Sequence, residues 1–370
     1  MALINYLTRI EFEEGAISRL PALLAELGVR RPLIATDRGL VSTGLVERVL
    51  GLFSERPIVF DGTPANPTEE AVEAAYALYV EEECDGIVGL GGGSSLDLAK
   101  AVRLLSGHEG PLAQYTAVEG GASRIHGRIC PMIAVPTTSG TGSEVGRAAV
   151  IITAEGRKLG ILSGFMLPSI ALCDPELTHG LPPFLTAATG MDALSHCLET
   201  YMAPAINPPA EAIALDGLKR GFPAIRQAVK NGQDHKARWD MMMAALEGAM
   251  AFQKGLGAVH ALTHPLGAIR ELNLHHGTLN AVLMPAVLQF NRPVIGAKWD
   301  VLADILGGEP DAVITALNRD IGMPSGLGAM GVTEAMMDKV SGEALKDHCH
   351  ATNPRLATKE DYLEIMRQSF

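Results

Sequence analysis

The sequence predicts an α/β domain with a parallel sheet, followed by an all-helical domain. Short β-branched apolar runs alternate with helical periodicity from residue 30 to about 175, a pattern typical of a parallel sheet covered by helices on both faces. After about Leu181 the strand-like runs disappear, and alanine, leucine, methionine and glutamate dominate. The chain has 370 residues, which is more than the roughly 250–300 at which a single core stops growing. We therefore predict two domains, residues 1–180 and residues 181–370.

Five apolar runs of the first domain are predicted to be buried strands, because each is short and bounded by glycine, proline or aspartate. They are RPLIAT (31–36), PIVF (57–60), DGIVGL (85–90), MIAVP (132–136) and SIALC (169–173). Helical periodicity predicts helices at 16–28, 38–53, 68–83 and 94–105. The runs AAVIIT and KLGILS, close together near 148–162, predict a hairpin inserted in this domain.

In the second domain the sequence predicts a helical bundle. Helix-forming residues with helical periodicity fill 192–202, 209–230, 237–252 and 311–322. No low-complexity linker separates the two halves, so we expect closely packed domains with a cleft between them.

Composition excludes several classes of protein. The net charge of −12 argues against a nucleic-acid partner, because phosphates would be repelled. The first residues do not resemble a signal peptide, and no apolar stretch reaches the ~18–20 residues of a membrane helix. The five cysteines are scattered and form no CxxC motif, which favours reduced thiols in a cytosol. We expect a cytoplasmic globular protein.

A glycine-rich turn follows the predicted strand at 85–90. The sequence GGGSS at 91–95 lets the backbone approach a ligand closely. Ser94 or Ser95 is expected to cap the next helix, whose N–H groups and positive dipole end attract phosphate. The spacing matches neither GxGxxG nor the P-loop, and an ordinary tight turn is the alternative. Its place after a parallel strand favours a dinucleotide site.

Two further segments suit the same site. PTTSGTGSE at 136–144 concentrates hydroxyls and backbone donors after a strand; the alternative is a polar surface loop capped by Ser143. Asp37 follows the first predicted strand, where an acid can bind a ribose hydroxyl. The alternative for Asp37 is an N-cap of the helix at 38–53. A carboxylate at this position would repel a 2′-phosphate, which favours NAD over NADP.

The second domain carries an unusual set of acidic and histidine residues. Asp192 and His196 are four residues apart, as are His260 and His264, so each pair shares one helix face. His275 and His276 follow downstream. A single histidine is usually a core or surface residue, but three such clusters in one chain favour a metal site. Three imidazoles and one carboxylate suit Fe²⁺ or Zn²⁺ better than Mg²⁺.

Pro265 affects the second of these pairs. It removes a backbone donor and disfavours α geometry at His264, so we expect the helix to kink or end there. Periodicity alone leaves open whether His264 is a ligand. Asp216, His235 and His348 have no partner at helical spacing, and we expect them to be solvated.

Together these segments resemble the iron-containing (group III) alcohol dehydrogenase family along nearly the whole chain. The motifs are TDRGL (36–40), ANPT (65–68), GGGSSLDLAK (91–100), PTTSGTGSE (136–144), CDPEL (173–177), TAATGMDALSHCLETY (186–201), VHALTHPLG (259–267), HHGTLNAVLMP (275–285) and NPR (353–355). The resemblance implies the dehydroquinate synthase-like fold of that family: a Rossmann-like dinucleotide-binding domain, then a helical domain, with the metal in the cleft.

The resemblance also implies site residues. The family's metal ligands fall on Asp192, His196, His260 and His276, and its proton-transferring histidine falls on His264. Its cofactor positions fall on Asp37, Asn66, Gly92, Gly93, Ser94, Asp97, Thr137, Thr138, Ser143 and Lys158. The loop before the HG motif departs from the family pattern, which leaves His275 as an alternative fourth ligand. Arg147 and Arg270 are candidates for binding an acidic substrate group, with a surface arginine as the alternative.

The predicted function is therefore that of a metal-dependent, NAD(P)-linked alcohol dehydrogenase or aldehyde reductase. The substrate would be a small alcohol or hydroxy acid, the cofactor NAD, and the metal Fe²⁺, with Zn²⁺ or another divalent ion as alternatives. A sugar-phosphate cyclase of the dehydroquinate synthase type and a maleylacetate reductase-like enzyme are the alternative functions. We also expect a homodimer or higher homo-oligomer, with no nucleic-acid or membrane partner.

Overall fold

The computed structural model of the protein describes residues 8–370, apart from the side chain of Arg270. These residues form two compact units. The N-terminal unit contains 8–138 and 142–180, and the helical unit contains 139–141 and 181–370. That the chain folds as two independent domains divided between residues 180 and 181 stays a prediction. In the described part of the chain, no helix is both long and apolar enough to cross a membrane.

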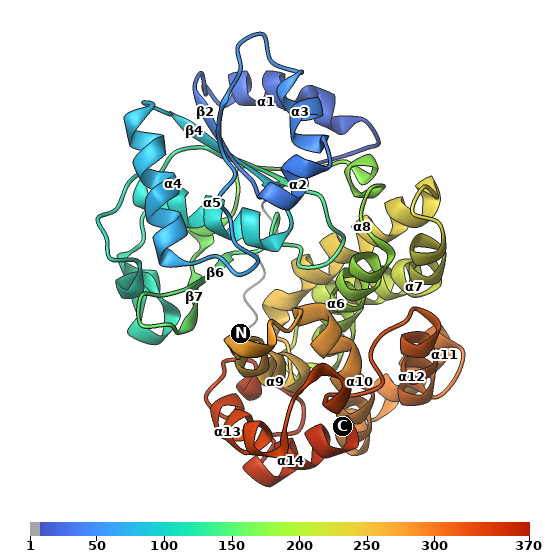
Figure 1. Cartoon of the computed structure of the whole chain (residues 1–370). Helices are drawn as coiled ribbons and strands as arrows, with labels where there is room; N and C mark the ends of the chain where they lie inside the picture. The colour runs from blue at the N-terminus through green and yellow to red at the C-terminus, as the bar shows by residue number, and fades with distance from the viewer. Residues whose placement is uncertain (1–7) are drawn as a thin grey trace. The chain divides into compact units, whose positions relative to one another are not determined.

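A parallel sheet forms the centre of the N-terminal unit and confirms the predicted fold class (Figure 1). The strand order within the described residues is β1-β8-β5-β4-β2-β3, and every neighbouring pair is parallel. The strands are β1 (Arg9–Phe12), β2 (Pro32–Ala35), β3 (Ile58–Phe60), β4 (Gly86–Gly91), β5 (Met132–Pro136) and β8 (Ile170–Cys173). The sequence did not predict β1, because this edge strand has only four residues and its charged Arg9 and Glu11 leave no continuous apolar run.

Helices cover both faces of this sheet, as Figure 1 shows. Leu33 and Ile87 point into the core under α4 and α5, whereas Ile34 and Val88 point into the core under α1 and α3. This alternation follows from the two-residue period of a strand. The helices are α1 (Leu20–Glu26), α2 (Arg38–Ser42), α3 (Leu45–Leu50), α4 (Glu69–Glu81) and α5 (Gly93–Leu105).

One helix prediction in this unit was wrong. The segment 38–53 forms two short helices, because Gly44 between them has φ 79, a left-handed conformation that ends a helix. The predicted hairpin is confirmed by antiparallel β6 (Ala148–Ile152) and β7 (Lys158–Leu162).

The helical unit is built around α6, which is buried from Thr186 to Met202. It packs against α7, α8 and α10, whose labels lie near α6 in Figure 1. The helices are α6 (Pro183–Met202), α7 (Pro208–Lys230), α8 (His235–Ala251), α9 (Ala258–Gly267), α10 (His276–Ile295), α11 (Ala297–Leu306), α12 (Pro310–Asp320), α13 (Glu334–Ala344) and α14 (Lys359–Gln368). Pro265 does not end α9 at His264 as expected, since the helix continues to Gly267.

Candidate metal and nucleotide sites

Three helices bring the predicted metal ligands together in the helical unit. Asp192 and His196 lie one turn apart on α6, His260 lies on α9, and His276 is the first residue of α10. Oδ1 of Asp192 lies 3.5 Å from Nε2 of His196, 3.8 Å from Nε2 of His260 and 3.7 Å from Nε2 of His276. One carboxylate oxygen is therefore surrounded by three imidazole nitrogens from three helices.

Small residues make this convergence sterically possible. A Cβ atom on Gly277 would lie 1.9 Å from the carbonyl oxygen of Ala188 and 3.3 Å from Cβ of Asp192. The N-terminus of α10 can therefore approach α6 only because residue 277 has no side chain. Where α8 packs against α6, a Cβ atom on Gly248 would lie 3.0 Å from Cβ of His196.

Burial in this cluster is uneven. Three of these residues are buried: Asp192, His196 and His260 are 3%, 5% and 1% exposed. The side chain of His276 is 30% exposed. The rings of His196 and His260 stack with centroids 4.9 Å apart. The cluster is thus closed around Asp192, His196 and His260, and its partly exposed member is His276.

The charges in this cluster suit a cation. Burial by itself would raise the pKa of Asp192, but the imidazoles of His196, His260 and His276 outweigh it and hold that pKa below its usual value. Burial lowers the pKa of His196 to about 4, so its ring is neutral at pH 7, as a metal ligand must be. Burial also opposes the charge on His260, but the nearby carboxylates of Asp192 and Glu199 raise its pKa to about 9, so a bound cation would displace a proton from this ring.

Three of the four donors lie close enough together for a single divalent ion, because Asp192, His196 and His260 each offer a ligand atom within 4.8 Å of the others. In a tetrahedral site with bonds of about 2.1 Å, ligand atoms lie about 3.4 Å apart, close to the separations around Oδ1 of Asp192. Nε2 of His260 is buried and has no hydrogen-bond partner among the described residues. A cation in this place would supply that missing partner.

Two polar residues around this cluster were missed by the sequence analysis. Asn280 Nδ2 donates a hydrogen bond to Oδ1 of Asp192 at 2.7 Å, and Glu199 Oε2 lies 2.6 Å from Nδ1 of His260. A signal existed for both. Asn280 lies four residues after His276, and Glu199 lies seven after Asp192, so each shares a helix face with a predicted ligand.

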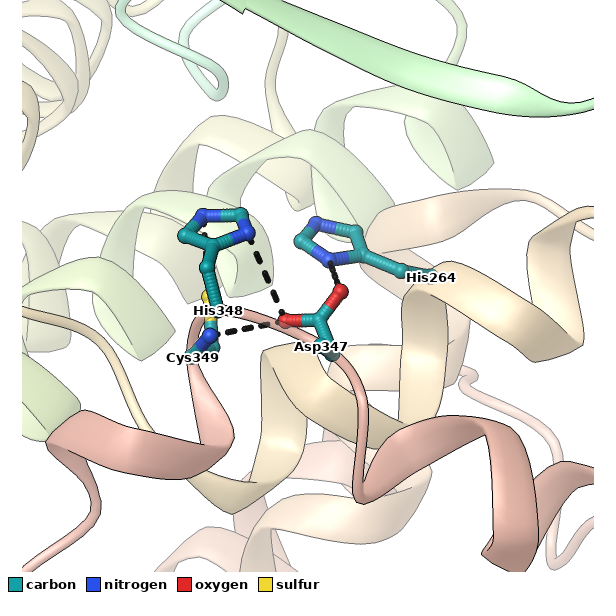
Figure 2. Close-up of side chains that lie close together, drawn as sticks. All are labelled: His264, Asp347, His348 and Cys349. Atoms are coloured by element: carbon teal, nitrogen blue, oxygen red, sulfur yellow. Dashed lines mark hydrogen bonds and ion pairs between the residues drawn. The ribbon is translucent and has the colours of Figure 1, made fainter. Parts of the chain in front are cut away.

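His264 lies beside this cluster but has a different partner. Its Nδ1 lies 2.8 Å from Oδ2 of Asp347, and its ring stacks on His276 with centroids 5.6 Å apart. Figure 2 shows Asp347 between His264 and His348. Oδ1 of Asp347 accepts a hydrogen bond from the backbone N–H of Cys349 at 2.8 Å. Burial would raise the pKa of Asp347, but the bond from His264 and the nearby imidazoles lower it to about 2.

The residues expected to be solvated behave differently from one another. His235 is exposed. Asp216 forms an ion pair with Arg220 at 2.7 Å, one helical turn away, so it does have a partner at helical spacing. His348 retains 68% side-chain exposure but lies 3.6 Å from Asp347, and the sequence could not reveal this grouping with distant His264.

The glycine turn of the N-terminal unit lies where three neighbouring strands end. Ala35 of β2 pairs with Gly89 of β4, and Gly91 of β4 pairs with Pro136 of β5. Asp37, the glycine turn and Thr137 therefore follow adjacent strands at the carboxyl edge of the sheet, where such sheets bind ligands. Gly91 has φ 149, and a Cβ atom there would lie 2.6 Å from Oγ of Ser95.

The helix after this turn is not capped by Ser94 or Ser95, contrary to expectation. Its N-cap is Gly92, which has no side chain, and α5 begins at Gly93. The hydroxyl of Ser94 donates to the carbonyl of Ala65 instead. A helix start made of glycine backbone suits contact with a phosphate.

Asp37 has the N-cap geometry that was the alternative to ribose binding. Its Oδ1 accepts a hydrogen bond from the backbone N–H of Leu40 at 2.9 Å. Its Oδ2 lies 3.4 Å from Oγ of Ser95, next to the glycine turn. Capping of α2 orients this carboxylate, and the two roles are compatible.

Other predicted cofactor residues form contacts within the N-terminal unit. Lys158 Nζ donates to Oδ1 of Asn66 at 2.9 Å, and the backbone N–H of Thr137 donates to Gly91 at 3.0 Å. Across from the turn, a Cβ atom on Gly92 would lie 3.4 Å from Cγ2 of Thr138. Lys158 thus reaches from the hairpin to the segment that contains Asn66.

Asp97 and Ser143 belong to a buried network. Ser143 Oγ donates to Oδ1 of Asp97 at 2.6 Å, and Lys100 Nζ donates to Ser143 Oγ at 2.8 Å. Oδ2 of Asp97 accepts from the backbone N–H of Val150 at 2.9 Å. These two predicted cofactor residues therefore hold the 142–150 segment against α5. Arg147 in this segment is exposed.

Comparison with known proteins assigns this pair of units to one family. A family model described as iron-containing alcohol dehydrogenase matches residues 8–175, and a second, described as the C-terminal part of the Fe-containing alcohol dehydrogenase family, matches residues 186–370. The chain belongs to the iron-containing alcohol dehydrogenase family. The resemblance seen in its motifs is confirmed, and the protein is an oxidoreductase that acts on CH–OH donors.

Individual members of the family resemble this alcohol dehydrogenase along its whole length. The 4-hydroxybutyrate dehydrogenase of Cupriavidus necator is 52% identical, with 100% of both chains covered. A solved structure of a 1,3-propanediol oxidoreductase has a TM-score of 0.95 at 36% identity, with 100% of both chains covered. The structure of sulfoacetaldehyde reductase from Bifidobacterium kashiwanohense with NAD⁺ has a TM-score of 0.91 at 26% identity, covering 100% of this chain and 99% of that one.

Proposed function

We propose that this alcohol dehydrogenase oxidises the C4 alcohol of 4-hydroxybutyrate to the aldehyde of 4-oxobutanoate, with transfer of a hydride to NAD⁺ and release of a proton, and catalyses the reverse reduction. The observation that carries this proposal is the 52% identity, over all of both chains, to a 4-hydroxybutyrate dehydrogenase. A related structure holds NAD⁺, and the carboxylate of Asp37 disfavours the 2′-phosphate of NADP. The glycine turn, with Asn66, Thr137, Thr138 and Lys158 near it, is the proposed cofactor site.

The proposed metal is Fe²⁺, held by Asp192, His196, His260 and His276, with Zn²⁺ or another divalent ion as an alternative. When bound, such an ion is a Lewis acid that lowers the pKa of a substrate alcohol or polarises a carbonyl, and the nicotinamide exchanges the hydride. Asp192 supplies the charge that retains the ion, and the partly exposed side of the cluster near His276 admits the substrate.

His264 is the proposed proton-transfer residue. Asp347 binds Nδ1 of this ring, which leaves Nε2 to exchange a proton with the substrate or with water. A carboxylate behind an imidazole fixes the ring orientation and its tautomer.

Removal of this proton route should slow turnover without removing the metal. We expect His264→Ala to lower kcat by roughly 10²-fold, within the usual contribution of a general acid or base. Asp347→Asn should lower kcat by roughly tenfold or more, because the amide can donate to Nδ1 and reverse the tautomer. Steady-state kinetics, with metal content measured on the same samples, checks both.

His348→Ala is the matched control for these two variants. Its ring lies 3.6 Å from Asp347, beyond hydrogen-bond distance, so kcat should stay within about twofold of the wild type. Unchanged turnover in both His264→Ala and Asp347→Asn would exclude this proton route.

A substrate panel tests the proposed function directly. NADH formation should give a higher kcat/KM for 4-hydroxybutyrate than for 1-butanol, which has the same chain length and no carboxylate. We expect a difference of at least about tenfold, which corresponds to roughly 1.4 kcal/mol of carboxylate recognition. Equal values for the two alcohols, or a clear preference for 1,3-propanediol, would refute the proposed substrate.

NADH formation, measured with and without bound metal, separates the alternative reactions. A cyclase of the dehydroquinate synthase type regenerates its cofactor in each turnover and would release no net NADH from a simple alcohol. A maleylacetate reductase-like enzyme would turn over without a metal. A homo-oligomeric state and a cytoplasmic location stay predictions from the sequence.

A further inference from the structure

Glu199 is a buried carboxylate outside the proposed metal ligands, cofactor site and proton-transfer pair. It lies on α6, on the face that also carries Asp192 and His196, and is 1% exposed. Its Oε2 lies 2.6 Å from Nδ1 of His260, while Nε2 of that imidazole faces Asp192 at 3.8 Å. The imidazole of His260 therefore lies between two carboxylates, with Glu199 at Nδ1 and Asp192 at Nε2.

Glu199 also contacts the backbone at the start of α9. Its Oε1 accepts a hydrogen bond from the N–H of Val259 at 2.7 Å, and its Oε2 lies 3.4 Å from the N–H of His260. The N–H groups of the first helical turn have no partner inside the helix and need one when they are buried. The N-cap residue, Gly257, has no side chain to supply it.

A second side chain completes this helix start. Oδ1 of Asn353 accepts a hydrogen bond from the N–H of Ala258 at 3.0 Å. A Cβ atom on Gly257 would lie 2.6 Å from that same Oδ1 and 2.9 Å from Oε1 of Glu199. Both caps of α9 thus come from outside the helix, but within this pair it is Glu199 that also binds the imidazole of His260.

We propose that Glu199 is a positioning residue of the metal centre. It fixes the backbone position of His260 at the start of α9 and the orientation and tautomer of its imidazole ring. Because Nδ1 donates its hydrogen to Glu199, the lone pair of Nε2 faces Asp192 and is available to an ion. A carboxylate behind a ligating imidazole also makes that ligand more basic. This inference rests on the proposed metal site, and it assigns a role to a residue that is not itself a ligand.

The test compares Glu199→Gln with Asn353→Ala. Both variants disturb the capping of α9, but Glu199→Gln alone removes the carboxylate behind His260. Affinity is measured by competition of the purified protein with a chromogenic chelator for Co²⁺. The visible spectrum of the Co²⁺-loaded protein reports ligand geometry. Neither measurement requires turnover.

We expect Glu199→Gln to bind Co²⁺ roughly 10- to 100-fold more weakly than the wild type, the usual effect of losing such a partner, and to show altered visible bands. Asn353→Ala should keep the wild-type spectrum and a Co²⁺ affinity within about threefold of the wild-type value. The thermal unfolding temperature of metal-free Glu199→Gln and of metal-free Asn353→Ala should be lower than that of the wild type. Glu199→Asp, which keeps the charge but is too short to reach Nδ1, should weaken binding as well and serves if the Gln variant does not fold.

Unchanged affinity and spectrum in the Glu199 variants would overturn this inference, as would an equal loss of affinity in Asn353→Ala, because helix capping would then explain the effect. These results differ from a failure of the proposed function, in which the wild-type protein itself would bind no divalent ion.

Discussion

His260→Ala should abolish both metal retention and alcohol oxidation. The imidazole of His260 is 1% exposed and lies between Asp192 and Glu199, so its removal leaves two buried carboxylates without their shared partner. We expect kcat/KM to fall at least about 10³-fold, since removal of one electrostatic contact to a reacting oxygen already costs 10²–10³-fold. Metal content by elemental analysis and NADH formation are measured on the same samples.

Variants of the adjacent histidines supply the control. His275→Ala changes the N-cap residue of α10 and should retain the metal, whereas His276→Ala should lose it. The reverse pattern would move the fourth ligand to His275. An active His260→Ala enzyme with no bound metal would contradict the proposed mechanism.

Gly277→Ala should be the most damaging small substitution near the site. The added methyl group would lie 1.9 Å from the carbonyl oxygen of Ala188, and this atom is backbone on the buried helix α6, so it cannot rotate away. We expect the free energy of unfolding to fall by about 3 kcal/mol, the upper part of the usual range for overpacking. Metal affinity should fall too, because the shift of α10 moves His276 away from Asp192. Urea unfolding and chelator competition measure the two effects.

Gly342→Ala is the matched control, since it lies within α13 and an added Cβ would have no atom within 4 Å. It should stabilise the protein by up to about 1 kcal/mol through helix propensity. Wild-type stability and metal affinity in Gly277→Ala would show that α6 and α10 are not in such close contact.

The sequence was most informative where local periodicity and burial agree. Apolar runs such as 132–136 are covered on both faces, so their strand character is visible without the structure. β1 was missed because Arg9 and Glu11 interrupt the apolar pattern at the edge of the sheet. The break at Gly44 was missed because glycine within a periodic segment is compatible with either a continuous or an interrupted helix.

The candidate metal cluster was predictable in part. The spacing of Asp192 and His196 places both on one face of a helix, and the structure brings His260 and His276 to the same carboxylate oxygen. Their role as ligands stays a prediction. The partnership of His264 with Asp347 was not predictable, because the two residues are 83 positions apart and come together only through tertiary packing.

The effect of Pro265 was overestimated for a physical reason. Proline removes one backbone donor, but α9 is only ten residues long and ends two residues later, so few of its hydrogen bonds are affected. The surrounding core holds the helix through this position. His264 therefore stays one turn from His260 on the same helix.

Anomalous diffraction at the iron edge, from a crystal of the iron-loaded protein, is the sharpest test of the proposed four-residue metal site. We expect one strong peak per chain, roughly 2.0–2.2 Å from Oδ1 of Asp192 and from Nε2 of His196, His260 and His276, at the bond lengths usual for such ligands. A peak bound elsewhere, or an enzyme that remains fully active with no peak at these four residues, would contradict it.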